Sequence, residues 1–331
     1  MSQNYYYGHG KLLLTGEYFV LDGAKSLALP TKLGQRMHVN YRPSNSPKLY
    51  WKSFDIDGKC WFETSFELWH FNCLVEETPE SETLKTILQQ ARAQNIHFLR
   101  EEVDVYVETV LEFPLNWGLG SSSTLIYNIA QWAYVSPFAL QAKSFGGSGY
   151  DIACAQSMGP ITYQINAAKR PHWETVSFNP VFKDNLYFVY LNQKQNSREA
   201  IGRYRDIVTP KEEVIEKVNL ITDKMLESID IKEFSSLMVE HENIIAMQLD
   251  LPRVKEEKFS DFWGEVKSLG AWGGDFALIA SERSPEETKH YFSKKGYGVV
   301  FSFDEFILQN FERFSEVKEN EKSEQTTSNP Q

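Results

Sequence analysis

The sequence predicts an α+β fold arranged in two lobes. The chain has 331 residues, about twice the usual domain length of ~150 residues. Its apolar fraction of 42% and charged fraction of 24% are ordinary for a folded globular protein. Strand patterns prevail in the first half and helical patterns in the second. We therefore expect an N-terminal lobe over residues 1–175, a C-terminal lobe over 176–314 and a disordered polar tail over 315–331.

The first half is predicted to contain several strands and few helices. Residues 103–108 alternate between apolar and polar side chains, as a half-buried strand does, and residues 35–42 show a weaker form of this pattern. Apolar side chains at helical spacing predict helices over residues 83–94 and 124–135. The second of these helices directly follows a turn that is rich in glycine and serine. A short apolar strand is expected to begin at Lys11.

The second half begins with a compact apolar run that predicts a buried strand over residues 186–191. Three helices are predicted next, at residues 211–228, 231–247 and 254–269. After them we expect strands at residues 276–280 and 299–301, with a helix beginning at Pro285 and another at Asp304. Proline at the first helical position, preceded by a serine cap, is a common start of a helix.

The composition argues against membrane and secreted proteins. The longest apolar stretch covers residues 11–29, but charged side chains interrupt it before it reaches the ~18–20 residues of a membrane span. The N-terminus lacks the basic start and apolar core of a signal peptide. The three cysteines form no Cys-x-x-Cys pair, which fits a reducing compartment. We expect a soluble cytoplasmic protein, either a monomer or a homodimer.

The net charge of −11 argues against non-specific binding to nucleic acid or to anionic membranes. A small polyanion such as ATP could still bind, provided that its attraction to the protein is local. A helix N-terminus, a few lysines or a metal ion would supply such local attraction.

One glycine-rich segment, residues 114–123, lies between a predicted strand and a predicted helix. The unpaired N–H groups of a helix that begins here could bind an anion, and glycines would let a phosphate approach the backbone. The alternative is a plain loop with a serine cap. The candidate phosphate-binding residues are Gly118, Leu119, Gly120, Ser121, Ser122 and Ser123.

Two further segments carry charged side chains beside glycines. Residues 8–18 place Lys11 before an apolar strand and Glu17 after it, which is also compatible with a core strand and solvated charges. Residues 146–153 lead through small side chains to Asp151, which is either a helix cap or a base that activates a hydroxyl group.

Together and in order, the three segments resemble the GHMP kinases, named for galactokinase, homoserine kinase, mevalonate kinase and phosphomevalonate kinase. Residues 9–18 are similar to the first family motif, residues 114–122 to the second and residues 270–275 to a degraded third. The resemblance covers residues 8–302. It implies a ribosomal-protein-like α/β N-terminal lobe and a ferredoxin-like α+β C-terminal lobe.

The resemblance also implies an activity, an ATP- and Mg²⁺-dependent phosphotransferase that acts on a small anionic alcohol or phosphate ester. Residues 148–153 and 159–163 look most like the phosphomevalonate kinase and mevalonate kinase branch, and so like enzymes of isoprenoid biosynthesis. Alternatives are a kinase for homoserine or a sugar, a related decarboxylase, and a non-catalytic binding module with the same fold. Two departures from the family pattern are Leu140, where mevalonate kinase has a metal-binding glutamate, and Trp272, where the family has a glycine.

The residue roles that the resemblance implies are as follows. Asp151 and Lys11 would be catalytic, and the glycine-serine turn would hold the phosphates of ATP. Ser122 and Glu17 would bind the metal ion. The substrate-binding residues would be Glu17, Ser148, Gly149, Lys194, Ser197, Gly273 and Gly274.

Overall fold

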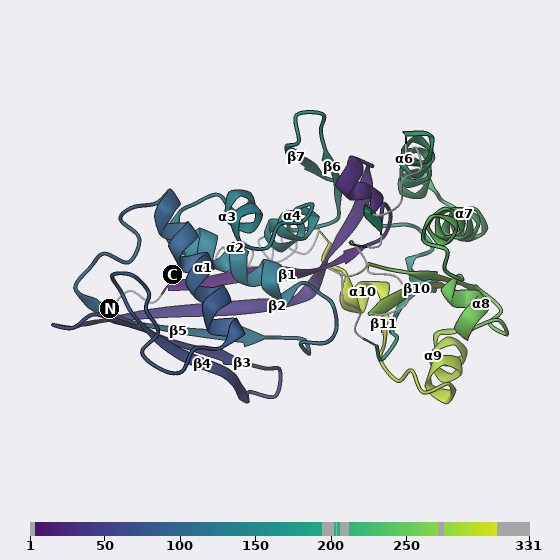
Figure 1. The fold of residues 1–331 in the computed structure, drawn as a ribbon. Coiled ribbons are helices and arrows are strands. Elements are labelled where there is room, and N and C mark those ends of the chain that lie inside the picture. Colours follow the sequence, from purple (N-terminus) through teal and green to yellow (C-terminus); the bar gives the residue numbers. More distant parts are fainter. Residues whose placement is uncertain (1–3, 194–201, 203, 206–211, 271–274, 310–331) are drawn as a thin grey trace, which may run out of the picture.

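Two β-sheets and the helices that cover them make up the computed structural model (Figure 1). It describes residues 4–193, 202, 204–205, 212–270 and 275–309. The expected tail over residues 315–331 lies outside these ranges. None of the helices within them is long and apolar enough to cross a bilayer.

The first sheet has the strand order β4-β3-β5-β2-β6-β7, and β1 pairs with β2 outside this path. Its strands are β1 (Asn4–Leu13), β2 (Ser26–Pro43), β3 (Lys48–Phe54), β4 (Cys60–Glu67), β5 (Val103–Leu111), β6 (Ile161–Ile165) and β7 (Pro171–Thr175). The predicted strands at residues 35–42 and 103–108 are confirmed as parts of β2 and β5. Lys11, however, lies near the end of β1 rather than at its start.

Four helices cover one face of this sheet (Figure 1). They are α1 (Pro79–Gln94), α2 (Ser121–Ala133), α3 (Pro137–Ser144) and α4 (Tyr150–Gln156). Both predicted helices are confirmed, but each begins earlier than its apolar pattern does. In α1, Thr78 and Ser81 form a capping box ahead of the apolar face. The two short helices α3 and α4 were not predicted as helices, because neither is long enough to show a clear period.

The second sheet has the order β11-β8-β10-β9 and is antiparallel throughout. Its strands are β8 (Leu186–Tyr190), β9 (Glu265–Ser268), β10 (Phe276–Ala280) and β11 (Val300–Ser302). Alternate residues of β8 face opposite sides of the sheet, so that Phe188 joins one apolar core and Val189 another. Burial on both faces explains why β8 reads as an unbroken apolar run.

Helices pack on both faces of the second sheet. They are α6 (Glu212–Glu227), α7 (Ile231–Leu249), α8 (Val254–Lys258), α9 (Pro285–Lys294) and α10 (Phe303–Phe306). The predicted helix over residues 254–269 is wrong: α8 ends at Lys258 and β9 begins at Glu265. Between them Gly264 lies so close to β10 that an added Cβ would be 2.0 Å from the carbonyl oxygen of Ala280. The chain therefore turns there to pair with β10 as a strand.

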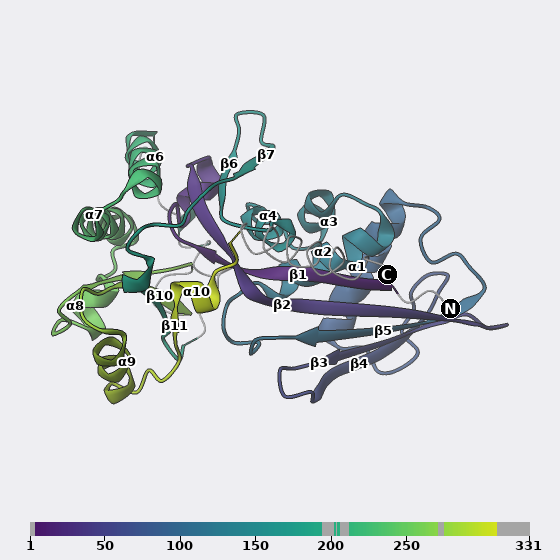
Figure 2. The same ribbon diagram turned by 180° about the vertical axis from the view of Figure 1, so that it is seen from behind.

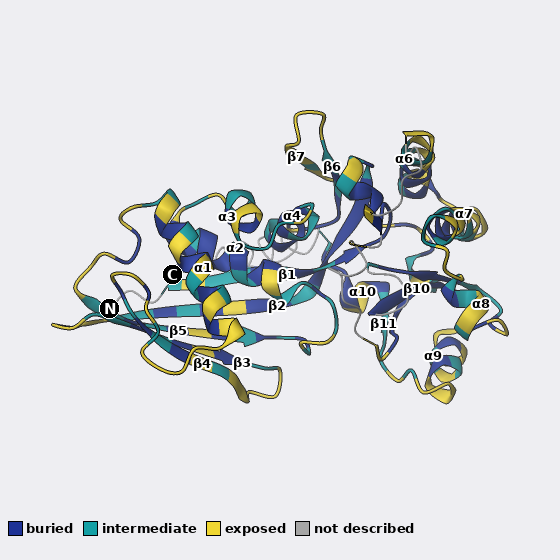
Figure 3. Ribbon diagram, in the orientation of Figure 1, coloured by how far each residue is buried: buried dark blue, intermediate teal, exposed yellow. Residues whose placement is uncertain are grey.

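The two sheets share one apolar core. Leu12 and Leu29 of the first sheet belong to the same buried cluster as Phe188 and Leu278 of the second. Figure 3 shows that the strands at this junction are buried, whereas exposed residues lie mainly on outer helices and loops. The chain then returns from α10 to the first residues of β2, where the backbone N–H of Leu308 donates to the carbonyl of Pro30 at 2.9 Å (Figure 2). The first sheet ends at Thr175 and the second begins at Leu186, and we propose that the lobes divide between them.

Candidate active site

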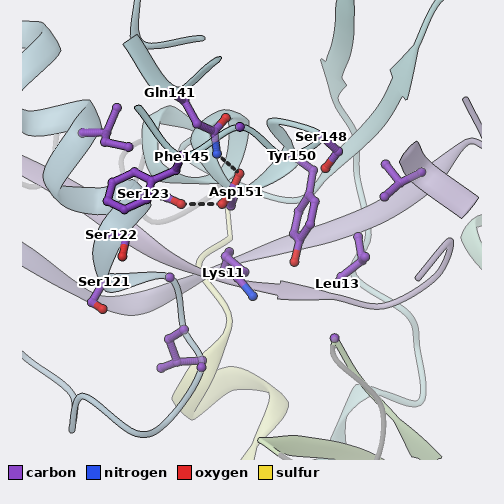
Figure 4. Close-up of a pocket in the computed structure, with 18 of the residues that line it drawn as sticks. Lys11, Leu13, Ser121, Ser122, Ser123, Gln141, Phe145, Ser148, Tyr150 and Asp151 are labelled. Carbon is purple, nitrogen blue, oxygen red and sulfur yellow. Dashed lines mark hydrogen bonds between the residues drawn. The ribbon is translucent and has the colours of Figure 1, made fainter. Parts of the chain in front are cut away.

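A cleft of about 460 Å³ lies where the glycine-serine loop, α3, α4 and the start of β10 meet (Figure 4). Lys11 reaches it from β1, Asp151 from α4 and Asp275 from the residue before β10. All six candidate phosphate-binding residues line it. The residues concerned are Gly118, Leu119, Gly120, Ser121, Ser122 and Ser123. The fold thus brings three separate sequence segments to one cavity.

The glycine-serine loop leads directly into α2. Gly120 is the N-cap and has a left-handed conformation (φ 87°), which glycine adopts without the penalty of a Cβ. No side chain caps the first turn of α2. Because the first N–H groups of a helix have no partner within it and carry its positive dipole end, this turn can bind an anion.

Aromatic packing holds the loop against the second sheet. The ring of Trp117 lies 5.6 Å from those of Phe276 and Phe301 and 5.7 Å from that of Tyr190. The hydroxyl of Tyr190 donates to the carbonyl oxygen of Asn116 at 3.1 Å. The position of the phosphate-binding candidates therefore depends on both sheets.

Lys11 follows an irregularity in the pairing of β1 with β2, between His9 and Lys11. Its backbone N–H donates to the carbonyl of Leu119 at 3.0 Å instead of to β2. Its side chain runs along Gly120, where an added Cβ would lie 3.2 Å from the lysine Cγ. An irregularity of this kind changes the direction in which a side chain points, and here the ammonium group points into the cleft.

The charge on Lys11 is stabilised inside the cleft. Burial alone would lower its pKa, but Tyr150, Asp275 and Asp151 outweigh burial and raise the pKa above the ordinary lysine value. The ammonium also lies 5.5 Å from the centre of the Tyr150 ring. Lys11 is therefore a permanent cation beside Asp151 at neutral pH.

Two neutral side chains hold the carboxylate of Asp151, as Figure 4 shows. The hydroxyl of Ser123 donates to Oδ2, and Nε2 of Gln141 donates to Oδ1 at 2.9 Å. Ser123 comes from the first turn of α2 and Gln141 from α3, so three helices meet at this carboxylate. The phosphate contact predicted for Ser123 stays a prediction, and the structure adds a hydrogen bond from its hydroxyl to Asp151.

Glu17 does not line the cleft, and its predicted roles as metal ligand and substrate ligand are corrected. Its side chain is 1% exposed and its Oε1 accepts a hydrogen bond from the ammonium of Lys267 in β9. Burial raises the pKa of Glu17 to about 7, although the neighbouring Lys267 acts in the opposite direction. A carboxylate enclosed with a lysine in this way is a structural group.

The other predicted substrate residues divide into two groups. Ser148 lines the cleft, and its carbonyl accepts a hydrogen bond from the hydroxyl of Tyr163. Gly149 is the left-handed N-cap of α4 and is not among the lining residues. Four candidates lie outside the described residues, namely Lys194, Ser197, Gly273 and Gly274, as does Trp272.

The structure adds lining residues that the sequence reasoning missed: Gln141, Tyr150, Asp275 and Arg205. Asp275 packs on the glycine loop so closely that a Cβ on Gly118 would lie 2.2 Å from its carboxylate. Its place at the end of the Gly-Gly-Asp triplet was a usable signal, whereas no local pattern pointed to Gln141 or Arg205.

Several solved structures with this arrangement of elements are of small-molecule kinases. Mevalonate kinase from Methanococcus jannaschii superposes with a TM-score of 0.70 at 13% identity, over 93% of this chain and 99% of that one. Phosphomevalonate kinase from Streptococcus pneumoniae, in complex with phosphomevalonate and AMPPNP, superposes with a TM-score of 0.67 at 16% identity. The match covers 91% of this chain and 100% of that one. Galactokinase from Lactococcus lactis, in complex with galactose, superposes with a TM-score of 0.63 at 12% identity. The match covers 91% of this chain and 93% of that one.

This chain has the GHMP kinase fold. The likeness extends over nearly the whole length of both partners in each comparison. No protein-family model and no curated protein matches the chain in sequence. At identities this low the likeness establishes the GHMP fold and not the activity.

Proposed function

We propose that this protein transfers the γ-phosphoryl group of ATP to a small anionic alcohol or phosphate ester. Mevalonate and phosphomevalonate are the first acceptors to test, because two kinases of similar fold are named for them. The observation that carries the proposal is the meeting of Lys11 and Asp151 in one cleft with the uncapped first turn of α2. A fold alone does not require a cation, a carboxylate and an anion-binding turn at a single place.

The glycine-serine loop would hold the donor phosphates. Its backbone N–H groups and helix dipole favour negative charge, and glycine at position 120 lets a phosphate approach the chain closely. The net charge of −11 repels nucleotides at long range. Binding of ATP would therefore depend on this loop and on Lys11.

The acceptor hydroxyl would lie beside Asp151. As its oxygen forms the new bond to phosphorus, the bond from phosphorus to the bridging oxygen of ADP breaks, and the hydroxyl proton passes to the carboxylate. Lys11 would stabilise the negative charge that develops on the transferred group. With a phosphate acceptor, which is already anionic, Asp151 would mainly orient Lys11.

A magnesium ion fits the donor groups of the cleft. Mg²⁺ prefers oxygen ligands and in kinases binds through one or two carboxylates together with substrate phosphates. The hydroxyl of Ser122 and the carboxylates of Asp151 and Asp275 line the cleft and could supply such oxygens. No group of three or more His, Cys, Asp or Glu within the described ranges could hold a metal ion by itself. The ion, when bound with ATP, would neutralise phosphate charge.

The experiment is a coupled assay of ADP release with Mg-ATP and four acceptors: mevalonate, phosphomevalonate, homoserine and galactose. We expect turnover with one of the two mevalonate compounds. Asp151→Asn should lower kcat by about 10²–10⁴-fold, the usual contribution of a general base. Asp57→Asn, which removes an exposed carboxylate from the β3–β4 turn, is the matched control and should leave kcat unchanged.

Two results would contradict the proposal. Full activity of Asp151→Asn would remove the carboxylate from the mechanism. Binding of Mg-ATP by the wild-type protein without turnover of any acceptor would instead identify a nucleotide-binding module that has kept the fold.

A further inference from the structure

We propose that Arg205 forms an anion-binding subsite at the acceptor end of the cleft. It would bind a carboxylate or phosphate group of the acceptor, at a distance from the hydroxyl that is phosphorylated. This inference rests on the proposed function, which it extends by naming the residue that selects anionic acceptors.

The cleft has two ends of different character. In the view of Figure 4, Ser121, Ser122 and Ser123 lie on one side of Asp151, while Leu13 and Ser148 lie on the other side, beyond Tyr150. The serine end contains the anion-binding turn of α2, where the nucleotide phosphates are expected. The opposite end is therefore the place for the acceptor.

The wall at the acceptor end is largely apolar. Leu13 and Val20 line the cleft and share a buried cluster, and Tyr18 and Leu21 line it as well. Such a surface suits a short carbon chain and offers few partners for the many hydroxyls of a sugar. Unpaired hydroxyls against an apolar wall would lose their hydrogen bonds to water, which disfavours sugar acceptors.

Arg205 is fixed beside this wall by its neighbour Tyr204. The ring of Tyr204 is 1% exposed and stacks on that of Tyr18 at 5.5 Å, with its edge toward Phe19 at 5.4 Å. Its hydroxyl donates to Oδ2 of Asp22 at 2.6 Å. These contacts hold the backbone that carries Arg205 against the turn that follows β1.

The guanidinium of Arg205 is available for a ligand. Arg205 is exposed and lines the cleft, and within the described part of the chain no hydrogen bond or ion pair engages it. Lys11, the other described cation of the cleft, already lies among Asp151, Asp275 and Tyr150. A guanidinium binds a carboxylate or a phosphate with two parallel hydrogen bonds, so one arginine suffices for recognition.

The test is calorimetric binding of R-mevalonate, phosphomevalonate and galactose in the absence of nucleotide. The proteins compared are the wild type, Arg205→Gln and Arg170→Gln, and the last removes the same charge from the exposed β6–β7 turn. We expect Arg205→Gln to weaken binding of at least one anionic acceptor about 10–100-fold, the scale of a charge-assisted contact. Arg170→Gln should have no effect, and galactose should bind to none of the three proteins.

The two anionic probes separate the two possible ligand groups. Equal losses for mevalonate and phosphomevalonate would indicate that Arg205 binds the carboxylate that both carry. A loss confined to phosphomevalonate would indicate its phosphate. Tyr204→Phe, which removes the hydroxyl that donates to Asp22, should weaken binding of the same acceptor by a smaller factor.

Several outcomes would overturn the subsite. One is unchanged affinity of Arg205→Gln for both anionic probes, and another is the absence of measurable binding of either probe to the wild type. Weaker binding of AMPPNP by Arg205→Gln, with unchanged acceptor binding, would assign the arginine to the nucleotide. Arg205-dependent binding of an acceptor without ADP release would refute the kinase function and leave the subsite intact.

Discussion

Asp151 is the residue on which the proposed chemistry depends, and the structure shows how it is held. Its two oxygens each accept a hydrogen bond from a neutral donor, Ser123 on one side and Gln141 on the other. The backbone N–H of Ile152 also donates to Oδ1, at 3.1 Å. These contacts leave the carboxylate little freedom to rotate, and pre-organisation of this kind favours reaction.

Gln141→Leu tests this positioning. The variant removes the donor to Oδ1 and keeps a side chain of similar size. We expect kcat to fall about 10-fold, the scale of one hydrogen bond to a charged group, because the carboxylate can then rotate away from the acceptor. The KM for ATP should stay constant, since Gln141 faces Asp151 and not the phosphate-binding turn.

The matched control is Gln89→Leu, which changes an exposed glutamine on α1 that does not line the cleft. Steady-state kinetics of both variants distinguish positioning from general destabilisation. An equal fall of kcat in the two variants, or none in Gln141→Leu, would refute the role of Gln141.

At the scale of elements, the glycine-serine loop is shaped by its contact with the second sheet. Gly118 has a φ of 66° and lies against Asp275, so that a methyl group there would meet the carboxylate at 2.2 Å. The same contact places Asp275 near Lys11. The loop, β1 and the start of β10 must therefore fit together for the cleft to form.

Gly118→Ala should weaken binding of Mg-ATP at least about 10-fold. It should also lower the free energy of unfolding by about 1–3 kcal/mol, because the alanine would be strained in the left-handed conformation and its methyl group would clash with the carboxylate. Gly296→Ala is the control, because Gly296 has a φ of 88° but open space around its Cβ position. Gly296→Ala should lower the free energy of unfolding by about 1–2 kcal/mol, from backbone strain alone, and should leave nucleotide binding unchanged. Chemical denaturation and a nucleotide titration measure both effects. Normal nucleotide binding by Gly118→Ala would show that the loop is not the phosphate site.

At the scale of the whole molecule, a buried polar cluster joins the turn after β1 to α7 and β9. Lys267 donates to Glu17 and to the carbonyl of Ser268 at 2.9 Å. Glu242 of α7 accepts the backbone N–H of Ser268 at 2.9 Å. Nε2 of His241 accepts the N–H of Gly16 at 2.9 Å, so this histidine is neutral and its proximity to Glu17 is not an ion pair.

The cluster should make stability depend on pH. Burial raises the pKa of Glu17 from 4.5 to about 7 in the folded protein. Between these two values the folded state holds a proton that the unfolded state has released, so stability falls as the pH rises from 4.5 to 7. For Glu17 alone, the free energy of unfolding falls by at most about 3 kcal/mol over this pH range.

Urea denaturation at several pH values between 4.5 and 7.5 measures this effect. Burial holds the pKa of His241 well below 6.5, which acts in the opposite direction and destabilises the protein as the pH falls below 6.5. The comparison of wild type with Glu17→Gln isolates the glutamate, because the histidine is common to both proteins. The variant should become more stable relative to the wild type as the pH rises. A constant difference across this range would show that Glu17 is ionised throughout.

Elements with a strong local pattern were predicted from the sequence. The alternation of β5, the apolar run of β8 and the helical periods of α1, α2, α6 and α7 all appear in the structure. The errors concern weak or ambiguous patterns. The segment from Val254 to Leu269 contains α8, a tight turn and β9. The buried side chains of these three parts happen to be spaced like one face of a helix.

Some parts of the candidate site have a conformation that follows from neighbouring residues alone. A left-handed Gly120 before three serines, a lysine in β1 and an aspartate at the start of α4 are all encoded by neighbouring residues. Which side chains meet depends instead on how the elements pack. The packing encloses Glu17 with Lys267, 250 positions away, and brings Gln141 and Ser123 to Asp151. Contacts of this kind depend on how sheets and helices pack, and packing leaves no period in the sequence of either partner.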